Sequence, residues 1–135
     1  MIKLSKKIEY GILALQYIAV HGDKVVSAKE ISEQMGIPYE FLSKTLQQLM
    51  KKGLIVSQHG IKGGYVLGKN ANDLTVKDII IALEGKASFL DCFVSSDGLI
   101  CERSPNCTIK DPMEKLQSKV MQVFSSTSIA EIATS

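Results

Sequence analysis

At 135 residues, with 45% hydrophobic and 22% charged residues and a net charge of +2, the chain has the composition of an ordinary globular domain and not of a disordered segment. It can bury a real core but has little room for a large catalytic cleft, and no cysteine–histidine neighbours, phosphate loop or paired carboxylates stand out, so we do not expect an enzyme. No stretch approaches the roughly 18 apolar residues of a membrane span and the N-terminus has no continuous apolar signal core, so we expect a cytoplasmic protein with no membrane partner.

The charge is unevenly distributed along the chain. Residues 1–69 carry ten lysines and five acidic residues, a balance of +5. Residues 70–135 carry six basic and nine acidic residues, a balance of −3. A basic first half suggests that this half meets a polyanion, although a chance fluctuation of charge is the alternative.

Two helices are predicted at the start of the chain. Residues 5–21 place apolar side chains at helical spacing. These side chains are Ile8, Ile12, Leu15 and Ala19. Ser27-Ala-Lys-Glu30 is a capping box, in which the Ser27 oxygen accepts the amide three residues on and Glu30 reaches back. It predicts a short helix that runs to about Met35 and is ended by Gly36.

A third helix is predicted after the dipeptide Ile37-Pro38, which disfavours helical backbone and turns the chain. The helix runs from Pro38 to about Lys52 and is closed by Gly53. Its expected apolar stripe consists of Phe41, Leu42, Thr45, Leu46, Leu49 and Met50. Its second face consists of Glu40, Ser43, Lys44, Gln47 and Lys51. Two helices joined through Met-Gly-Ile-Pro predict a helix-turn-helix.

A β-hairpin is predicted directly after this helix. Leu54-Ile-Val-Ser57 and Tyr65-Val-Leu67 are β-rich runs that flank a glycine-rich loop. The glycines permit positive φ and close backbone approach to a phosphate or to the minor groove of DNA. We expect Tyr65 to pack at the base of the hairpin. A helix-turn-helix followed by such a hairpin is a winged arrangement.

The second face of the third helix carries groups that read base edges in the major groove or bind flanking phosphates. The alternative is a solvated polar face, but the preceding turn and the following hairpin favour contact with DNA. The candidate DNA-contacting residues are Tyr39, Glu40, Ser43, Lys44, Gln47 and Lys51 on the helix, with His59, Lys62, Gly63 and Gly64 on the hairpin. Lys6, Lys7 and Lys24 are interpreted as phosphate contacts or plain surface.

A fourth helix is predicted over residues 76–84. Thr75-Val-Lys-Asp78 caps its start and Gly85 ends it. Residues 86–110 then follow neither the helical nor the strand period, and all three cysteines fall in this segment.

The end of the chain is expected to be helical. Asp111-Pro112-Met-Glu114 supplies an N-cap, a proline at the first helical position and an acid in the first turn. The apolar side chains of this helix are Met113, Leu116, Val120, Val123 and Phe124. Ser128-Ile-Ala-Glu131 caps a last short helix.

Cys92, Cys101 and Cys107 are separated by eight and five residues. An odd number of cysteines in a cytosolic chain fits metal or redox chemistry better than a disulfide framework. Thiolates at this spacing in an irregular segment can hold one small inorganic centre, as in iron–sulfur proteins. Three buried free thiols are the alternative. A zinc site with a fourth ligand is weaker, because no Cys-x-x-Cys pair is present.

Four stretches are distinctive: Ile-Glu-Tyr-Gly-Ile-Leu-Ala-Leu at 8–15, Glu-Ile-Ser-Glu-Gln-Met-Gly-Ile-Pro at 30–38, Lys-Lys-Gly-Leu-Ile-Val-Ser at 51–57 and Gly-Ile-Lys-Gly-Gly-Tyr-Val-Leu at 60–67. Together they resemble the IscR, NsrR and RirA family of bacterial winged-helix regulators. The resemblance covers nearly the whole chain, including the three cysteines after Leu-Glu-Gly and the closing Ser-Ile-Ala-Glu-Ile-Ala.

The resemblance implies a homodimer that crosses through the helix beginning at Asp111 and reads a roughly palindromic operator in double-stranded DNA. It also implies a [2Fe-2S] or [4Fe-4S] iron–sulfur cluster on the three cysteines, which reports iron, oxidants or nitric oxide. A dimer follows from physical reasoning too, since the apolar stripe of that helix needs a partner face.

Two positions depart from the pattern of this family. The eight-residue gap after Cys92 is longer than the gap of five in IscR and NsrR, and Lys110 stands where the IscR pattern supplies a histidine ligand. The fourth cluster ligand therefore comes from elsewhere. Glu9 is the candidate, because it aligns with a first-helix acid that some NsrR-like members use. The alternative for Glu9 is a surface acid with local salt bridges, and Asp91, Glu102 or a small thiol are other candidate ligands.

The sequence thus predicts a mainly α fold with a small β-hairpin wing. Residues 1–85 form a winged helix-turn-helix DNA-binding domain, 86–110 a cluster-binding loop, and 111–135 a long dimerisation helix with a short C-terminal helix. The predicted function is that of a transcriptional repressor whose operator affinity is controlled by the cluster. Two alternatives stay open: a metal-free thiol or disulfide switch, and a module that binds another protein and no DNA.

Overall fold

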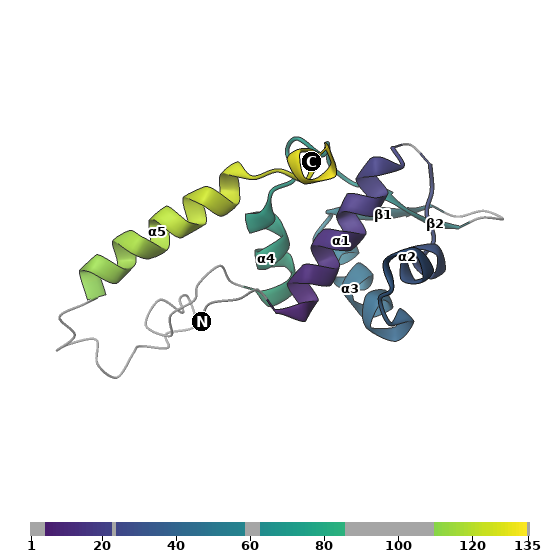
Figure 1. Cartoon of the computed structure of the whole chain (residues 1–135), viewed down its shortest axis with the longest axis horizontal. Helices are drawn as coiled ribbons and strands as arrows, with labels where there is room; N and C mark the ends of the chain where they lie inside the picture. The colour runs from purple at the N-terminus through teal and green to yellow at the C-terminus, as the bar shows by residue number, and fades with distance from the viewer. Residues whose placement is uncertain (1–4, 23, 59–62, 86–109, 135) are drawn as a thin grey trace.

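The computed structural model describes residues 5–22, 24–58, 63–85 and 110–134. Over these ranges the chain forms, in order, α1 (Lys6–Val20), α2 (Ala28–Met35), α3 (Tyr39–Lys51), β1 (Ile55–Gln58), β2 (Gly64–Leu67), α4 (Val76–Glu84), α5 (Lys110–Ser126) and α6 (Ile129–Thr134). Figure 1 shows α1–α4 and α6 gathered into one body, with the hairpin at one end and α5 projecting at the other. The predicted mainly α fold with a hairpin wing is confirmed.

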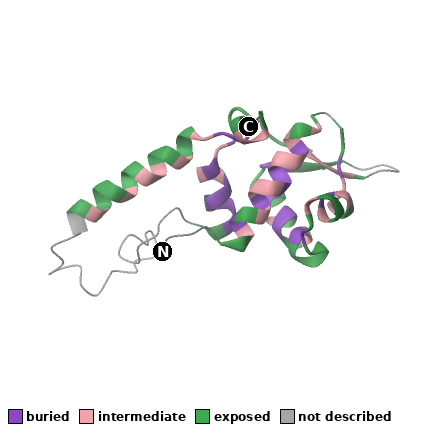
Figure 2. Ribbon diagram, in the orientation of Figure 1, coloured by how far each residue is buried: buried purple, intermediate pink, exposed green. Residues whose placement is uncertain are grey.

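α1 is the central helix of the body. Ser5 caps its first turn, where the serine hydroxyl accepts a hydrogen bond from the Ile8 amide at 3.3 Å. Its fully buried side chains are Ala14, Leu15 and Ile18. Ile12 and Ala19, which share the predicted helical spacing with Ile8 and Leu15, are half-buried and pack at the edge of the core. In Figure 2 the buried residues gather on α1, α3 and α4.

The hairpin is joined to the helical body by a third extended segment. β1 and β2 pair antiparallel, with Val56 opposite Val66 and Ser57 opposite Tyr65. Val26, which precedes α2, forms an isolated bridge with Tyr65 on the other edge of β2. Because the Val26 side chain is buried in the main core, this bridge fixes the base of the wing to the body. Tyr65 packs against the core as predicted.

α4 begins with a complete capping box, as predicted. The Asp78 amide donates to the Thr75 hydroxyl at 3.2 Å, and the Thr75 amide donates to the Asp78 carboxylate at 3.1 Å. Gly85 ends the helix in the left-handed region with φ of 80°, where the lack of a side chain removes the usual steric cost.

The segment between α5 and α6 pairs with the segment that leads into α4. The Val76 amide donates to the Thr127 carbonyl at 3.0 Å, and the Ile129 amide donates to the Leu74 carbonyl at 2.7 Å. Ile129 is fully buried in the main core. The Gln16 side chain adds a hydrogen bond to the Ile132 carbonyl at 3.1 Å. These contacts attach α6 to α1 and anchor the C-terminal end of α5.

α5 begins at Lys110, one residue before the predicted N-cap, so Asp111 lies in the first turn. Phe124, near the C-terminal end of the helix, packs against a small apolar cluster that includes Ile8 and Ile80. Along the rest of α5 most of the surface is open to solvent (Figure 2). None of the helices in the described part of the chain combines the length and apolarity that a bilayer crossing needs.

Candidate nucleic-acid interface

The turn between α2 and α3 is held by local hydrogen bonds. Gly36 ends α2 in the left-handed region with φ of 68°, which places Ile37 in the core with 2% exposure. The Ile37 amide donates to the Ser32 carbonyl at 3.2 Å, and the Ser32 hydroxyl donates to the Ile37 carbonyl at 2.6 Å. Pro38 then stands at the N-cap of α3. These contacts within the chain hold the turn between the two helices.

One face of α3 is buried and fixes the helix. Its buried side chains are Leu42, Thr45, Leu46 and Leu49. The Thr45 hydroxyl is satisfied by the Phe41 carbonyl at 3.0 Å. Gly11 of α1 lies beside this face, where a Cβ would be 3.9 Å from the Thr45 methyl group, an ordinary contact, but only 2.7 Å from Cδ1 of Leu83 on α4. α3 is thus packed against α1, α2 and α4.

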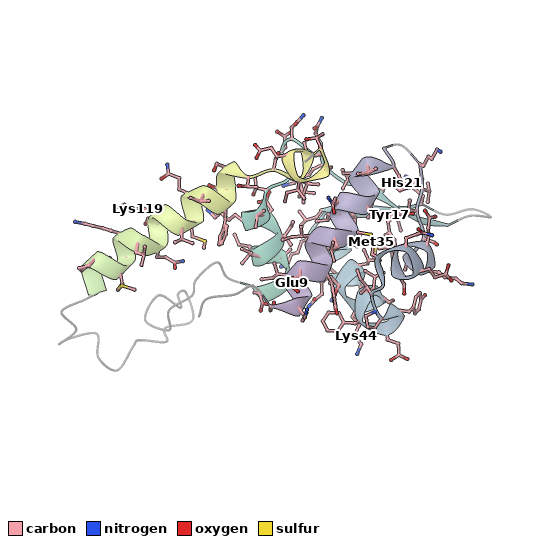
Figure 3. All side chains as sticks on the ribbon, in the orientation of Figure 1. Glu9, Tyr17, His21, Met35, Lys44 and Lys119 are labelled. Atoms are coloured by element: carbon pink, nitrogen blue, oxygen red, sulfur yellow. The ribbon has the colours of Figure 1, made fainter. Side chains whose placement is uncertain are left out.

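The opposite face of α3 carries the predicted DNA-contacting side chains. Tyr39, Glu40, Lys44, Gln47 and Lys51 are exposed, and Ser43 is half-buried. Figure 3 shows Lys44 on α3 at the outer side of the body. The structure therefore brings all six predicted helix residues onto an accessible face of one rigid element.

Two members of the predicted apolar stripe lie at its edge. Phe41 is 40% exposed and Met50 is 37% exposed, so their assignment to the buried face was wrong. The stripe was drawn too wide, because only about 100° of a helix surface faces a core. The Phe41 ring instead packs against Tyr10 on α1 in an edge-to-face arrangement, with the ring centroids 5.1 Å apart.

A cleft lies between α3 and the start of α1. Its volume is about 510 Å³, and it is lined by Lys7, Phe41, Lys44, Thr45, Gln47, Gln48 and Lys51. The sequence pattern does not distinguish Lys7 from Lys6 or Lys24, and it does not single out Gln48. The contact between α1 and α3 that unites these residues is a tertiary feature without a local sequence signal.

Of the four predicted DNA-contacting residues on the hairpin, the structure describes the two glycines. Gly63 is exposed and Gly64 is half-buried. Gly64 has a structural reason to lack a side chain, since a Cβ would lie 2.3 Å from the Val26 carbonyl oxygen. His59 and Lys62 lie outside the described residues.

On another part of the surface, α1 is connected to α2 through Tyr17 and Glu30, with His21 beside Tyr17 (Tyr17 and His21 are labelled in Figure 3). The Tyr17 hydroxyl donates to Glu30 at 2.6 Å, and the Tyr17 ring stacks on His21 with centroids 4.2 Å apart. The hydrogen bond to Glu30, then burial and the nearby negative charge, raise the pKa of Tyr17. The Glu30 amide still donates to Ser27 at 3.0 Å, but the predicted reach of the Glu30 carboxylate back to Ser27 is replaced by the contact with Tyr17.

Of the four predicted cluster ligands, the structure describes only Glu9. Cys92, Cys101 and Cys107 lie outside the described residues. Glu9 is on the first turn of α1, 46% exposed, with its carboxylate 3.2 Å from the Lys6 ammonium group. Over the residues that the structure describes, no three His, Cys, Asp or Glu side chains gather into a metal-binding group.

A helix-turn-helix with an accessible polar second helix, followed by a two-stranded hairpin, defines the winged-helix class of DNA-binding transcriptional regulators. The Rrf2 family, described as "Iron-dependent Transcriptional regulator", matches residues 4–135. The chain belongs to this family, whose members are regulators and not enzymes.

Three similar proteins illustrate the relationship. The protein rrf2 of Nitratidesulfovibrio vulgaris is 36% identical over 106 residues, which cover 78% of this chain and 69% of that protein. The structure of CymR, the global cysteine regulator of B. subtilis, is 27% identical with a TM-score of 0.79, covering 99% of this chain and 98% of CymR. The structure of T. potens IscR is 30% identical with a TM-score of 0.78, covering 98% of this chain and 87% of IscR.

Proposed function

We propose that this chain is a homodimeric repressor that binds double-stranded operator DNA through α3 and the hairpin, and that an iron–sulfur cluster controls its affinity for DNA. In this proposal residues 1–85 bind DNA, 86–110 hold the cluster and 111–135 form the dimer. The observation that carries the proposal is the accessible polar face of α3, on a helix fixed by three others, in a chain of a family described as iron-dependent.

The exposed face of α3 has the chemistry of a major-groove reader. An α-helix fits the groove, which is about 12 Å wide. Gln47 offers an amide donor and acceptor for a base edge, and the hydroxyl of Ser43 can join it. Lys44 and Lys51 supply cations for bases or for the backbone phosphates on either side.

The dimer rests on the apolar side of α5. In the single chain Val123 is 61% exposed and Leu116 is 43% exposed, with Met113 and Val120 half-buried nearby. These residues recur at three- and four-residue spacing, as in the seam of a helical pair. A second copy of α5 would remove this surface from water and place two α3 helices on one duplex.

The chemistry of the donor set fits the cluster. Three thiols are soft ligands of the kind that hold iron–sulfur clusters. Glu9 fits the fourth position, because its carboxylate is half-exposed and its described ion pair joins it only to Lys6, three residues earlier on the same helix. Such an exposed pair is weak, so the carboxylate is available for exchange. When bound, a cluster supplies a centre whose charge and integrity depend on iron and oxidants.

Binding to DNA is tested by gel shift with a duplex of about 40 base pairs, long enough for two half-sites, selected from a random pool by the wild-type protein. The wild type is expected to shift this duplex, whereas Lys44→Glu combined with Lys62→Glu abolishes the shift. Lys115→Glu combined with Lys119→Glu, both exposed on α5, changes the charge by the same amount, is the charge control and is expected to bind. Equal binding by the double variant and the control contradicts the proposed interface.

The cluster is tested on protein purified without oxygen. We expect visible absorbance together with iron and acid-labile sulfide, all lost in Cys92→Ala, Cys101→Ala and Cys107→Ala, and a DNA affinity that differs between loaded and iron-free protein. Glu9→Gln should give a less stable cluster, while Lys6→Gln should not. Colourless preparations without iron and sulfide refute the cluster.

The dimer is tested by sedimentation. The wild type is expected at twice the chain mass and Val123→Glu at the chain mass, with unchanged helical content because Val123 is exposed in the single chain. A monomeric wild type contradicts this part of the proposal.

A metal-free thiol switch is the second candidate, and the similarity to CymR favours it as much as the similarity to IscR favours a cluster. In this case the cysteines would oxidise reversibly and change the affinity for DNA. Iron-free protein that loses DNA binding with oxidant and regains it with a thiol reductant supports the switch.

A further inference from the structure

The cleft between α1 and α3 concentrates positive charge. Of the seven side chains that line it, three are lysines and none is acidic. In the described part of the chain, Lys7, Lys44 and Lys51 have no carboxylate within ion-pairing distance, whereas Lys6 is paired with Glu9 at 3.2 Å. Three ammonium groups that face one cleft repel one another, so an anion placed there lowers the electrostatic energy.

The remaining wall of the cleft is built to stay in place. Phe41 forms an apolar part of the wall and is held against Tyr10 of α1 in an edge-to-face contact. The Thr45 hydroxyl is already bonded to the Phe41 carbonyl, so it is not a free donor. The amides of Gln47 and Gln48 are the neutral donors that remain beside the lysines. The cleft thus offers cations and amide donors on a rigid floor.

The position of the cleft identifies its occupant. Lys44, Gln47 and Lys51 are exposed on the same face of α3 that the proposed function places in the major groove. An α-helix with its side chains is about 10–12 Å across and fills a groove about 12 Å wide. The sugar-phosphate strand that borders the groove therefore passes along the side of α3, where the start of α1 stands. We infer that Lys7 completes a phosphate-binding cleft with Lys44 and Lys51, which takes the backbone of the duplex beside the major groove.

This inference rests on the proposed binding of DNA by α3 and adds α1 to the interface. It separates Lys7 from its neighbour Lys6, which is paired with Glu9 and does not line the cleft. A phosphate contact carries no base information, so Lys7 contributes to affinity on every sequence. Gln47, in contrast, contributes to discrimination between sequences.

The test compares Lys7→Gln with Lys6→Gln, which remove the same charge from adjacent positions of one helix. The dissociation constant for the selected duplex and for a scrambled duplex is measured from about 0.05 to 0.3 M salt. For Lys7→Gln we expect a loss of about fivefold per bound protomer at 0.15 M salt, equal on both duplexes, and a salt slope smaller by about 0.9 per bound protomer. Lys6→Gln should keep the wild-type slope, and Lys7→Arg should restore it. Thermal melting checks that the variants are folded.

Each outcome decides a separate point. If the wild type binds and Lys7→Gln keeps the slope of Lys6→Gln, the cleft does not hold a phosphate and the inference fails while the proposed function stands. If Lys7→Gln weakens only the selected duplex, Lys7 reads bases and the inference also fails. If the wild type binds neither duplex, the proposed function fails, and the inference fails with it.

Discussion

Replacement of Gly64 by alanine should destabilise the whole domain, although the residue lies in the wing. A Cβ at this position would lie 2.3 Å from the carbonyl oxygen and 2.6 Å from the carbonyl carbon of Val26, and 2.9 Å from the Ser27 amide nitrogen. All three atoms belong to the backbone, so no side-chain rotation relieves the overlap. The strand that contains Gly64 has to move away from Val26.

The cost follows from what this movement breaks. The Val26 amide donates to the Tyr65 carbonyl at 3.1 Å, and the Tyr65 amide donates to the Val26 carbonyl at 2.7 Å. Two such bonds contribute about 1–3 kcal/mol together. Partial exposure of the Val26 side chain, which is 1% exposed, adds about 1 kcal/mol. Alanine restricts the unfolded chain and returns about 0.4–1 kcal/mol. We therefore expect a net loss of about 2 kcal/mol, or roughly 8 °C in Tm for a domain of this size.

Thermal and urea unfolding at one fixed protein concentration measure this loss, because association with a second copy would shift Tm. The comparator is Gly11→Ala, whose Cβ would lie 2.7 Å from the end of the Leu83 side chain. That methyl group can rotate away, and alanine gains about 1 kcal/mol inside a helix, so this variant should melt close to the wild type. A Gly64→Ala variant as stable as the wild type refutes the reasoning.

Three other substitutions probe separate parts of the fold. The hydrogen bond to Glu30 raises the pKa of Tyr17. This contact therefore stabilises the fold below the ordinary tyrosine pKa of about 10, and the stabilisation is lost as the pH rises through the higher pKa of the folded state. Ultraviolet titration should show a late tyrosine ionisation step that Tyr17→Phe removes. Ile129→Ala should lower the free energy of unfolding by about 2–5 kcal/mol, because Ile129 is fully buried, whereas the exposed Thr134→Ala on the same helix should change the urea midpoint little. Thr75→Ala should cost about 1–2 kcal/mol in the same assay through the lost N-cap, and Thr75→Ser should recover most of it.

Local chemistry made the helix boundaries readable from the sequence. Thr75 and Asp78 form the capping box that their spacing predicts, and Gly85 ends the helix where a left-handed residue is needed. Such signals lie within a few residues of one another and do not depend on the rest of the fold. Glu30 is the exception, because a partner thirteen residues earlier, Tyr17, takes its carboxylate.

The candidate site could be predicted only in part, because local signals do not encode contacts between separate helices. The polar face of α3 follows from helical spacing, and its exposure is confirmed. The participation of Lys7 depends on how the start of α1 packs beside α3. Phe41 was misassigned because its partner, Tyr10, stands on another helix. Periodicity identifies a face of one element, whereas a cleft between two elements is a product of their packing.

The anchoring of α5 at one end makes this helix a lever. Its C-terminal end is clamped where the 127–129 segment pairs with the entry to α4, and its 17 residues extend about 25 Å from that clamp. A tilt of about 10° at the clamp therefore moves the far end by about 4 Å. The cysteine-bearing segment 86–109 precedes that far end in the chain, so a displacement of this end by a few ångströms corresponds to a rotation of α5 about its clamp by about 10°.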